Sequence, residues 1–366
     1  MKPKVSVQIL NYNGKKFLEG CIDSTLKQDY PNFEIVLIDN ASIDGSVEFV
    51  KERYKREIKK NKIKIIELNR NYGFAGAYNY SYRKTDADYV LLLNNDTLLP
   101  DKKMISLMVK RAESDPKTAC VSAGIYPFNT DLRKAKEQSP GTLSLILTNT
   151  LTPLKGNRLF YSSGCCCLIK KKLIDIPFDS DYFAYSEDVY LGWKVNLLGY
   201  KNVLEPKAKL LHYGFGSSGA GSPFVRYYGE RNRILNCLIF YETTTLIKIL
   251  PLLFIYFIVS GLFFMQRPKV FAAYLKAYLW ILFHPFKILA KRRKIQRLRK
   301  VSDSRVLELL SYKIFFTEPK LTSFYDTLKK RRWLLEVITK ISYLLDKLSF
   351  LYCNFIGLEL LKENTS

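Results

Sequence analysis

Four apolar segments in the N-terminal part of the chain each end in polar or glycine-rich residues that could bind a ligand: Val5–Asn11, Phe33–Asp39, Ile63–Leu68 and Tyr89–Leu93. The second ends in Asp39, whose carboxylate can accept hydrogen bonds from a base or a ribose. Gly73 and Gly76 follow the third segment and allow a backbone to approach a ligand closely. Asp96 follows the fourth, where a carboxylate is a natural ligand for Mg²⁺ or Mn²⁺ beside a bound phosphate.

Three further residues have side chains suited to proton transfer or metal binding. Glu187 and Asp188 stand at the start of an amphipathic segment, Asp188–Leu198. A carboxylate there can take a proton from an incoming hydroxyl, or it can cap a helix and complement the helix dipole. His212 follows an apolar run and precedes a Gly/Ser-rich segment, 214–219, which favours exposure at a site over a structural role. Imidazole suits Mn²⁺ better than Mg²⁺.

The elements that must position these residues alternate between strands and helices. Helical spacing is found over 15–27, 46–54 and 77–83, and further strands are predicted over 117–125 and 164–169. Strands that are apolar on both faces and alternate with helices predict an α/β fold with a mostly parallel sheet covered on both sides. Ligands bind at the carboxyl ends of such strands, so the four strand ends should form one site.

Two common nucleotide-binding patterns are missing from the sequence. The run from Gly73 to Gly76 lacks the G-x-G-x-x-G spacing and follows the third strand, and no G-x-x-x-x-G-K-[ST] loop occurs. Neither a dehydrogenase nor a P-loop nucleotidase is therefore expected.

The cysteines and the N-terminus indicate a reducing compartment. Seven cysteines occur, three of them consecutive at 165–167, and no C-x-x-C is present. This pattern predicts no disulfide framework, and it predicts a buried strand over Ser162–Ile169 rather than a metal site. Residues 1–13 lack the apolar core and cleavage site of a secretory signal.

The net charge of +24 favours a polyanionic partner, namely nucleic acid, an anionic membrane face or a phosphate-bearing substrate. Residues 236–366 carry 22 basic and 9 acidic residues, so the basic character is concentrated there. No RNP, KH, zinc-finger or helix-turn-helix pattern is present, and we therefore expect no nucleic-acid partner. A hydrophobic content of 48% excludes a wholly disordered chain.

The composition changes near residue 240, which predicts a catalytic domain over 1–240 and a helical, basic, membrane-associated region over 241–366. Ile249–Met265 is apolar and uncharged, Val270–Ala290 is apolar but contains Lys276, and Lys291–Lys300 is basic. A spanning hairpin would place the basic run in the cytosol but would bury Lys276. In-plane or re-entrant helices avoid that cost and are favoured. A soluble helical cap is the third alternative.

Seven motifs in order resemble the family-2 inverting glycosyltransferases of the GT-A fold, and within them the rhamnosyltransferase-like group. They are NYNG, LIDNASIDGS, NRNYGFAGAYN, LLLNNDTLL, FAYSEDVYLGWKVNLLGY, LLHYGFGSSG and YYGERNRI, and they extend over about residues 3–236. An ordered set of seven is far more specific than any single motif.

The resemblance implies a role for each matching residue. Asn11, Asp39 and Asp44 would hold the nucleotide, and Gly73, Phe74 and Gly76 would line the diphosphate and donor sugar. Asp188 matches the general base. Asp96 matches the last Asp of the family's D-x-D metal motif, and His212 matches a metal-ligating His. The acceptor or the diphosphate would be contacted by a last group of four residues: Gly164, Glu187, Arg231 and Asn232.

One position departs from the family pattern. Asn94 stands where the first Asp of D-x-D is expected, so the site has one negative charge fewer while Asn94 remains on the donor side. A requirement for Mg²⁺ or Mn²⁺ is expected, with weaker metal affinity.

The implied reaction is a single inverting displacement by an acceptor hydroxyl on a nucleotide-sugar donor, with Asp188 as the base and no second catalytic carboxylate. The acceptor would be a glycan or lipid-linked glycan at the cell membrane, with the catalytic domain on the cytoplasmic side and the tail on an anionic membrane surface. A nucleotidyltransferase, which would release pyrophosphate, and a polyanion-binding protein are the alternatives.

Overall fold

The computed structural model describes residues 2–128, 130–132, 142–150, 156–214, 221–314 and 332–360. The Gly/Ser-rich segment at 215–219 lies outside the described residues. By its internal contacts the chain divides into two compact units. The first comprises residues 1–140, 156–195 and 200–217, and the second comprises 141–155, 196–199 and 218–366. Each unit is described by itself.

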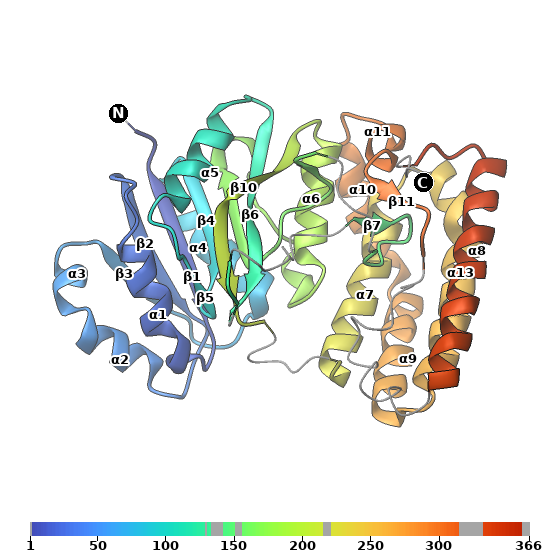
Figure 1. Ribbon diagram of the computed structural model, residues 1–366, viewed down its shortest axis with the longest axis horizontal. Coiled ribbons are helices and arrows are strands. Elements are labelled where there is room, and N and C mark those ends of the chain that lie inside the picture. Colours follow the sequence, from blue (N-terminus) through green and yellow to red (C-terminus); the bar gives the residue numbers. More distant parts are fainter. Residues whose placement is uncertain are drawn as a thin grey trace. The chain divides into compact units, whose positions relative to one another are not determined.

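The first unit is built on a mixed sheet whose strands lie in the order β3-β2-β1-β4-β9-β6-β10-β5, with β8 also paired to β10 (Figure 1). Its strands are β1 (Val5–Asn11), β2 (Phe33–Asp39), β3 (Ile63–Glu67), β4 (Tyr89–Asn94), β5 (Thr97–Leu98), β6 (Thr118–Pro127), β8 (Arg158–Leu159), β9 (Cys166–Lys170) and β10 (Lys201–His212). The first four strands are parallel to one another, whereas β9 runs antiparallel between β4 and β6. The predicted α/β fold with a mixed, mostly parallel sheet is confirmed.

The helices of the first unit are α1 (Lys15–Leu26), α2 (Ser46–Arg53), α3 (Lys55–Lys59), α4 (Gly73–Lys84), α5 (Met104–Glu113) and α6 (Glu187–Leu197). Strands β1, β2 and β4 are almost wholly buried, because the helices cover both faces of the sheet and shield the side chains there from water. Each fully buried Ile, Leu or Val stabilises the fold by about 1.5–3 kcal/mol. The triple cysteine lies in this core, as predicted.

The predicted boundaries were wrong at two places. Helix α4 begins at Gly73, four residues before the predicted start at Ala77. The glycine-containing run is therefore the first turn of a helix, held there by contacts from distant loops. Strand β9 begins at Cys166 rather than at Gly164.

The second unit contains the helices α7 (Pro223–Phe240), α8 (Thr243–Phe264), α9 (Pro268–Phe283), α10 (Pro285–Arg297), α11 (Asp303–Leu307) and α13 (Arg332–Phe355). A short two-stranded parallel sheet in the same unit pairs β7 (Leu143–Ser144), from the middle of the chain, with β11 (Leu310–Ser311). The apolar segment 270–290 is two helices, because Pro285 cannot continue α9 and instead starts α10.

The described residues contain one helix long and apolar enough to cross a membrane, α8. The predicted boundary at residue 240 stays a prediction. The contacts group α7 and residues 141–155 with the C-terminal helices.

Candidate functional site

Polar side chains at the carboxyl ends of β1, β2 and β4 form one hydrogen-bonded network. Parallel pairing sets Asn11 opposite Asp39 and Leu10 opposite Asn94, so these ends meet as the sequence predicts. Asn11 Nδ2 donates to Asp39 Oδ1 at 3.0 Å, and Asn95 Nδ2 donates to Asn11 Oδ1 at 2.7 Å. The backbone N–H of Ser42 donates to Asp39 Oδ2 at 2.9 Å. Both carboxylate oxygens of Asp39 are thus oriented, and each retains a lone pair for a ligand.

The Asp44 carboxylate accepts hydrogen bonds from the first residues of two helices, α1 and α2. Its Oδ2 accepts the backbone N–H of Lys15 at 2.9 Å, and its Oδ1 accepts the N–H of Ser46 at 3.1 Å and also the Ser46 hydroxyl. Although burial alone would raise the pKa of Asp44, the hydrogen bonds from Ser46 and Lys15 outweigh it and lower the pKa. Asp44 therefore fixes the loop that follows Asp39, whatever else it binds.

The turn before α4 is clamped by two asparagines and by a distant carbonyl. Asn40 Oδ1 accepts the N–H of Tyr72 at 2.9 Å, and Asn71 Oδ1 accepts the N–H of Gly73 at 2.8 Å. The carbonyl of Phe183 accepts the N–H of Phe74 at 2.5 Å. Gly73 has φ +70°, and a Cβ added there would lie 2.4 Å from the Phe183 carbonyl oxygen. Glycine is required at position 73 for both reasons.

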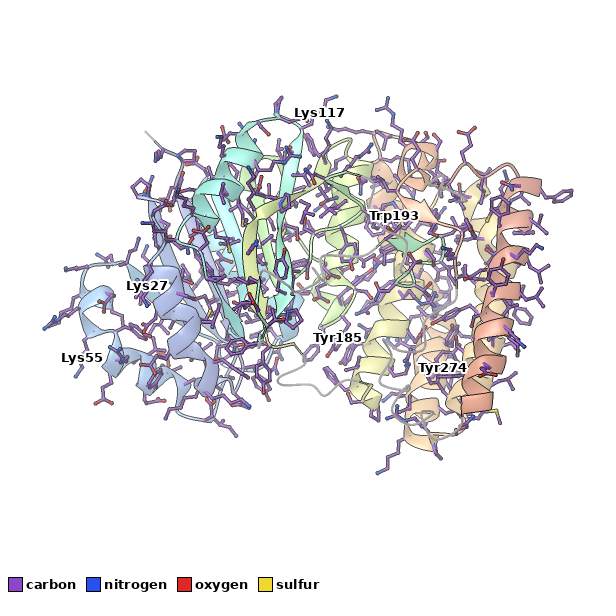
Figure 2. All side chains as sticks on the ribbon, in the orientation of Figure 1. Lys27, Lys55, Lys117, Tyr185, Trp193 and Tyr274 are labelled. Atoms are coloured by element: carbon purple, nitrogen blue, oxygen red, sulfur yellow. The ribbon has the colours of Figure 1, made fainter. Side chains whose placement is uncertain are left out.

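Backbone strain concentrates around these loops. Asn13 and Ala41 have positive φ, as do Phe183, Tyr185 and Ser186 in the segment that leads into α6. Tyr185 is labelled in Figure 2. Positive φ is unfavourable for residues with a side chain and tends to cluster at functional sites.

Asp188 lies at the second residue of α6 with its carboxylate oriented by two backbone donors. The N–H of Gly164 donates to Oδ2 at 3.3 Å, and the N–H of Val189 donates to Oδ1 at 2.8 Å. Burial raises the pKa of Asp188 to about 6, although these N–H groups act in the opposite direction. A carboxylate with a pKa near 6 is ionised at neutral pH and basic enough to take a proton.

Phe74 and Gly164 are packed beside Asp188. A Cβ added to Gly164 would lie 3.2 Å from Phe74 Cζ and 3.6 Å from Asp188 Cβ. The structure thus brings the N-terminal turn of α4, the segment before β9 and the start of α6 to one place. Gly76 lies one turn further along α4, against Tyr72.

Glu187 is buried next to Asp188, and its Oε2 has no hydrogen-bond partner among the described residues. Burial, and then the neighbouring charge of Asp188, raise the pKa of Glu187 well above its ordinary range. The pKa values of both acids are thus raised, and a second negative charge next to the first is unfavourable.

Asp96 and His212 form a close pair after β4 and at the end of β10. Their Oδ1 and Nε2 atoms are 3.3 Å apart. Burial alone would lower the pKa of His212, but hydrogen bonds with Asp96 and Cys165 raise it to about 10. The described residues contain no group of three or more His, Cys, Asp or Glu that could hold a metal. One carboxylate and one imidazole are a suitable donor pair for Mn²⁺, provided that other ligands come from the bound substrate and water.

Arg231 and Asn232 lie in the second unit, on α7. Arg231 Nε and Nη2 donate to Asn232 Oδ1 at 2.9 and 2.8 Å. The guanidinium also lies over the rings of Tyr228 and Trp280, 4.8 and 5.0 Å from their centroids. The pair is buried, so its contact with an acceptor or a diphosphate stays a prediction.

Sequence reasoning missed several residues that shape the site. Asn40, Ser42, Asn71 and Asn95 orient its backbone or its carboxylates, and Phe183 fixes the start of α4. The four polar residues were visible in the strand-end runs, since short polar side chains after a strand commonly bind backbone groups. The contact between Phe183 and Gly73 spans more than 100 residues of sequence, and no local pattern signals it.

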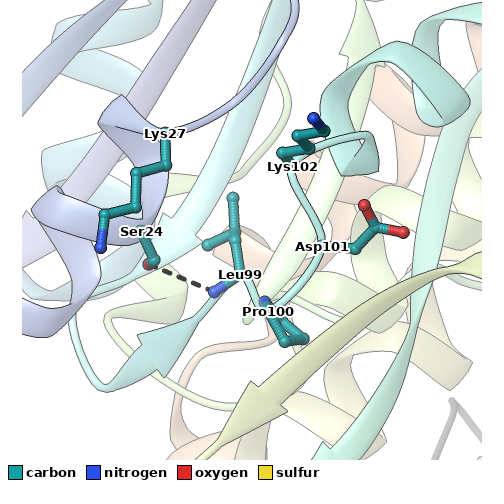
Figure 3. A pocket seen from close by; sticks show the side chains of 6 residues that line it. All are labelled: Ser24, Lys27, Leu99, Pro100, Asp101 and Lys102. Atoms are coloured by element: carbon teal, nitrogen blue, oxygen red, sulfur yellow. Dashed lines mark hydrogen bonds between the residues drawn. The ribbon is translucent and has the colours of Figure 1, made fainter.

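A separate hollow of about 540 Å³ is lined by Ser24, Lys27 and residues 99–102 (Figure 3). Two of the lining residues are hydrogen-bonded to each other, since Ser24 Oγ accepts the backbone N–H of Leu99 at 3.2 Å. None of the predicted site residues lines it.

Comparison with known proteins shows what part of the first unit is similar to. Residues 6–176 match the family described as "Glycosyl transferase family 2". The chain is 29% identical over 218 residues to the poly-beta-1,6-N-acetyl-D-glucosamine synthase of Staphylococcus aureus (strain COL), which covers 57% of this chain and 51% of that protein. The corresponding synthase of Staphylococcus epidermidis is 27% identical over 207 residues, covering 56% and 48%. The chain therefore spans about half the length of the curated relatives it matches.

Solved structures show the same fold at low identity. GalNAc-T7, solved with UDP, GalNAc and Mn²⁺, aligns with a TM-score of 0.55 at 17% identity, over 66% of this chain and 48% of that one. The mannosyltransferase PcManGT from Pyrobaculum calidifontis, solved with GDP-Man and Mn²⁺, aligns with a TM-score of 0.50 at 16% identity, over 98% and 89%. These similarities confirm the predicted GT-A fold class.

Proposed function

We propose that this chain, whose residues 6–176 carry the glycosyl transferase family 2 region, transfers a sugar from a nucleotide-diphosphate donor to an acceptor hydroxyl with inversion of configuration. The observation that carries the proposal is the state of Asp188. It is a partly buried carboxylate with a pKa raised to about 6, oriented by two backbone N–H groups, beside a loop that carries backbone strain.

The proposed reaction uses one proton transfer and one displacement. Asp188 takes the proton of the acceptor hydroxyl as that oxygen forms its bond to the anomeric carbon. The bond from the anomeric carbon to the diphosphate oxygen breaks at the same time, and the nucleoside diphosphate leaves with the electron pair. Attack opposite the leaving group inverts the anomeric carbon, so the reaction needs no covalent intermediate. The raised pKa of Glu187 disfavours a second negative charge next to the base.

The strand-edge network would bind the donor. Asn11 and Asp39 are oriented to accept from or donate to the nucleotide, and Asp44 holds the adjoining loop. Gly73, Phe74 and Gly76 border the space next to Asp188, where the diphosphate and the donor sugar would lie. Asn94 ends β4 beside them, and its backbone carbonyl is already bound by Thr97 Oγ1 at 2.7 Å.

Asp96 and His212 would hold a divalent cation, Mn²⁺ or Mg²⁺. Such a cation would neutralise charge that develops on the leaving diphosphate. The raised pKa of His212 means that the imidazole must lose a proton before it can bind the metal, so metal affinity should increase with pH.

The identities of the donor sugar and of the acceptor form a second part of the proposal. The resemblance to the rhamnosyltransferase-like group is compatible with transfer of a hexose or of a deoxyhexose. The curated relatives named above are N-acetylglucosamine polymer synthases, which favours an N-acetylhexosamine donor and a polysaccharide acceptor. A glycan or lipid-linked glycan at the cytoplasmic face of the cell membrane satisfies both alternatives, and the apolar helix α8 with the basic run after it supports that location.

A donor screen would test the proposal. The full-length chain is incubated with UDP-N-acetylglucosamine, UDP-glucose, GDP-mannose and dTDP-rhamnose, each with and without Mn²⁺, and thermal stabilisation is measured first because it needs no acceptor. Membrane extract then serves as the acceptor source, and the phosphorus product is analysed. Release of nucleoside diphosphate supports glycosyl transfer, whereas release of pyrophosphate would identify a nucleotidyltransferase.

A further inference from the structure

The second unit carries one helix whose polarity is reversed. On α13 the residues that face the rest of the unit are polar or small, namely Ser342, Asp346, Ser349 and Cys353, and all four are buried. Apolar residues spaced alternately three and four apart face outward instead: Ile341, Leu344, Leu348, Leu351 and Phe355. Between 48% and 88% of each of these five side chains is exposed. We call these five residues the α13 stripe.

Hydrogen bonds from the buried face fix this orientation. Asp346 Oδ1 accepts the backbone N–H of Ile314 at 3.0 Å, and Ser349 Oγ donates to the carbonyl of Tyr312 at 2.8 Å. Rotating α13 to bury its stripe would break both bonds and leave polar groups without partners. A helix of a water-soluble surface does the opposite and buries its apolar face. The α13 stripe therefore needs an apolar environment outside the unit.

Helix α8 shows the same need and is joined to α13. Lys248 Nζ donates to the Ile356 carbonyl at 2.6 Å, and Tyr352 Oη donates to the Lys248 carbonyl at 2.8 Å. Ile247, Phe254 and Leu262 of α8 are each about three-fifths exposed. Two neighbouring helices with exposed apolar faces are more than a soluble surface normally carries.

The inner face of α8 contacts charged residues. Tyr256 Oη donates to Glu230 Oε1 at 3.4 Å, and the Arg226 guanidinium lies 3.9 Å from the centroid of the Phe264 ring. Glu230 in turn pairs with Arg226 and Arg233 at 2.9 and 2.8 Å on α7. A helix of 22 residues is long enough to cross a bilayer, at about 33 Å. Crossing would nevertheless carry this ion network to the depth of the hydrocarbon, where charged groups are costly.

The charges beside the α13 stripe favour lipid over a second copy of the chain. Lys340 and Lys347 are exposed and flank the stripe seven residues apart. In a parallel pair of α13 helices these lysines would face Leu345 and Tyr352, and in an antiparallel pair they would face one another. Neither arrangement pairs them with an acid, whereas an anionic headgroup layer does.

We propose that the second unit binds a single leaflet of an anionic membrane, with the exposed faces of α8 and the α13 stripe inserted among the lipids and neither helix crossing the bilayer. This inference deepens the membrane location given under the proposed function. It requires no transfer activity, so it can fail or succeed independently of the catalytic proposal.

The first experiment measures flotation of the purified full-length chain with vesicles of phosphatidylcholine and phosphatidylserine. Leu344→Gln with Leu348→Gln should weaken the partition coefficient by about tenfold or more, because each half-exposed leucine loses its contact with hydrocarbon. Asn354→Gln, an exposed position outside the stripe on the same helix, should leave it unchanged. Both are uncharged changes to a good helix former, and unchanged thermal unfolding of each variant in the absence of vesicles would show that the fold is intact. Equal flotation of the double variant and the wild type would overturn the proposal. So would a wild-type dimer that the double variant dissociates.

The second experiment distinguishes one leaflet from a crossing. All seven cysteines are buried and free, so a new surface cysteine can be labelled selectively. Gln266→Cys places one in the exposed turn between α8 and α9, and Lys55→Cys places another on α3 of the first unit (Figure 2). When protein is added to the outside of sealed vesicles, an impermeant maleimide should label both. Protection of position 266 with labelling of position 55 would show that α8 crosses the bilayer and would overturn the proposal.

Discussion

Replacing Asp188 with Asn should lower activity and stabilise the fold, because the ionised carboxylate is held in a partly buried position that disfavours its charge. Burial raises the pKa of Asp188 from 3.8 to about 6. Ionising the group in the folded state therefore destabilises the protein as the pH rises above 3.8, and the effect is complete above about 6. The shift corresponds to about 3 kcal/mol of unfolding free energy at pH 8 and to about half of that at pH 5.

The difference between those two values is the quantity to measure. Thermal or urea unfolding of Asp188→Asn and wild type should show that the stability gain of the variant grows by about 1–2 kcal/mol from pH 5 to pH 8. Changes in the hydrogen bonds from Gly164 and Val189 add an offset that is the same at both pH values. Glu187→Gln is the matched control at the neighbouring acid: if Asp188 is the group that titrates in this range, only the Asp188 variant should show this growth.

The same pKa fixes the shape of the activity profile. Turnover of the wild type should reach a plateau above about pH 7. At pH 5 it should be about tenfold lower than that plateau, since the base must be ionised. Asp188→Asn should lower turnover by about two to four orders of magnitude with donor affinity little changed. A stability gain of Asp188→Asn that is equal at pH 5 and pH 8 would refute the buried-base reasoning. Loss of the acidic limb in Glu187→Gln would assign the proton transfer to Glu187 instead.

Three further perturbations test other parts of the structure. Gly73→Ala should destabilise the protein by about 1–3 kcal/mol more than Gly156→Ala in thermal unfolding, because both have φ near +70° but only the Cβ at position 73 meets the Phe183 carbonyl; equal losses would show that the Phe183 contact is unimportant. Asp96→Ala should abolish metal-dependent transfer and weaken Mn²⁺ binding measured calorimetrically in the presence of nucleoside diphosphate, with the melting temperature little changed. Unaltered transfer would remove Asp96 from the mechanism. High salt alone should not extract the full-length chain from membranes whereas detergent should, because salt screens the basic run at 291–300 but leaves the apolar contacts of α8 intact; complete release by salt would contradict those apolar contacts.

Contacts within the second unit decide whether the chain can be truncated for experiments. A cut near Glu242 would separate β7 from its partner β11 and remove Arg292, whose Nη1 donates to the carbonyls of Leu238 and Tyr241 at 2.6 and 2.7 Å. The full-length chain is therefore the better material for each measurement above.

The sequence by itself determined the elements of the first unit and the order of the site residues along the chain. Strands buried on both faces read as continuous apolar runs, so β1, β2 and β4 were placed within a residue of their observed ends. Parallel pairing then brings the carboxyl ends of such strands to one edge, which made Asn11 and Asp39 predictable neighbours. The acidic pair at 187–188 was also predictable, because it precedes an amphipathic run.

The tertiary structure decided what local patterns do not encode. The start of α4 at Gly73 depends on the Phe183 carbonyl and on Asn40, which lie far away in the sequence. The raised pKa values of Glu187 and Asp188 depend on burial, which the Gly164 N–H opposes at Asp188, and neighbouring residues in a sequence give no measure of either. On α13 the sequence shows an amphipathic helix, but which side faces the rest of the second unit was settled by the hydrogen bonds of Asp346 and Ser349. Periodicity defines two faces of a helix, and long-range contacts choose between them.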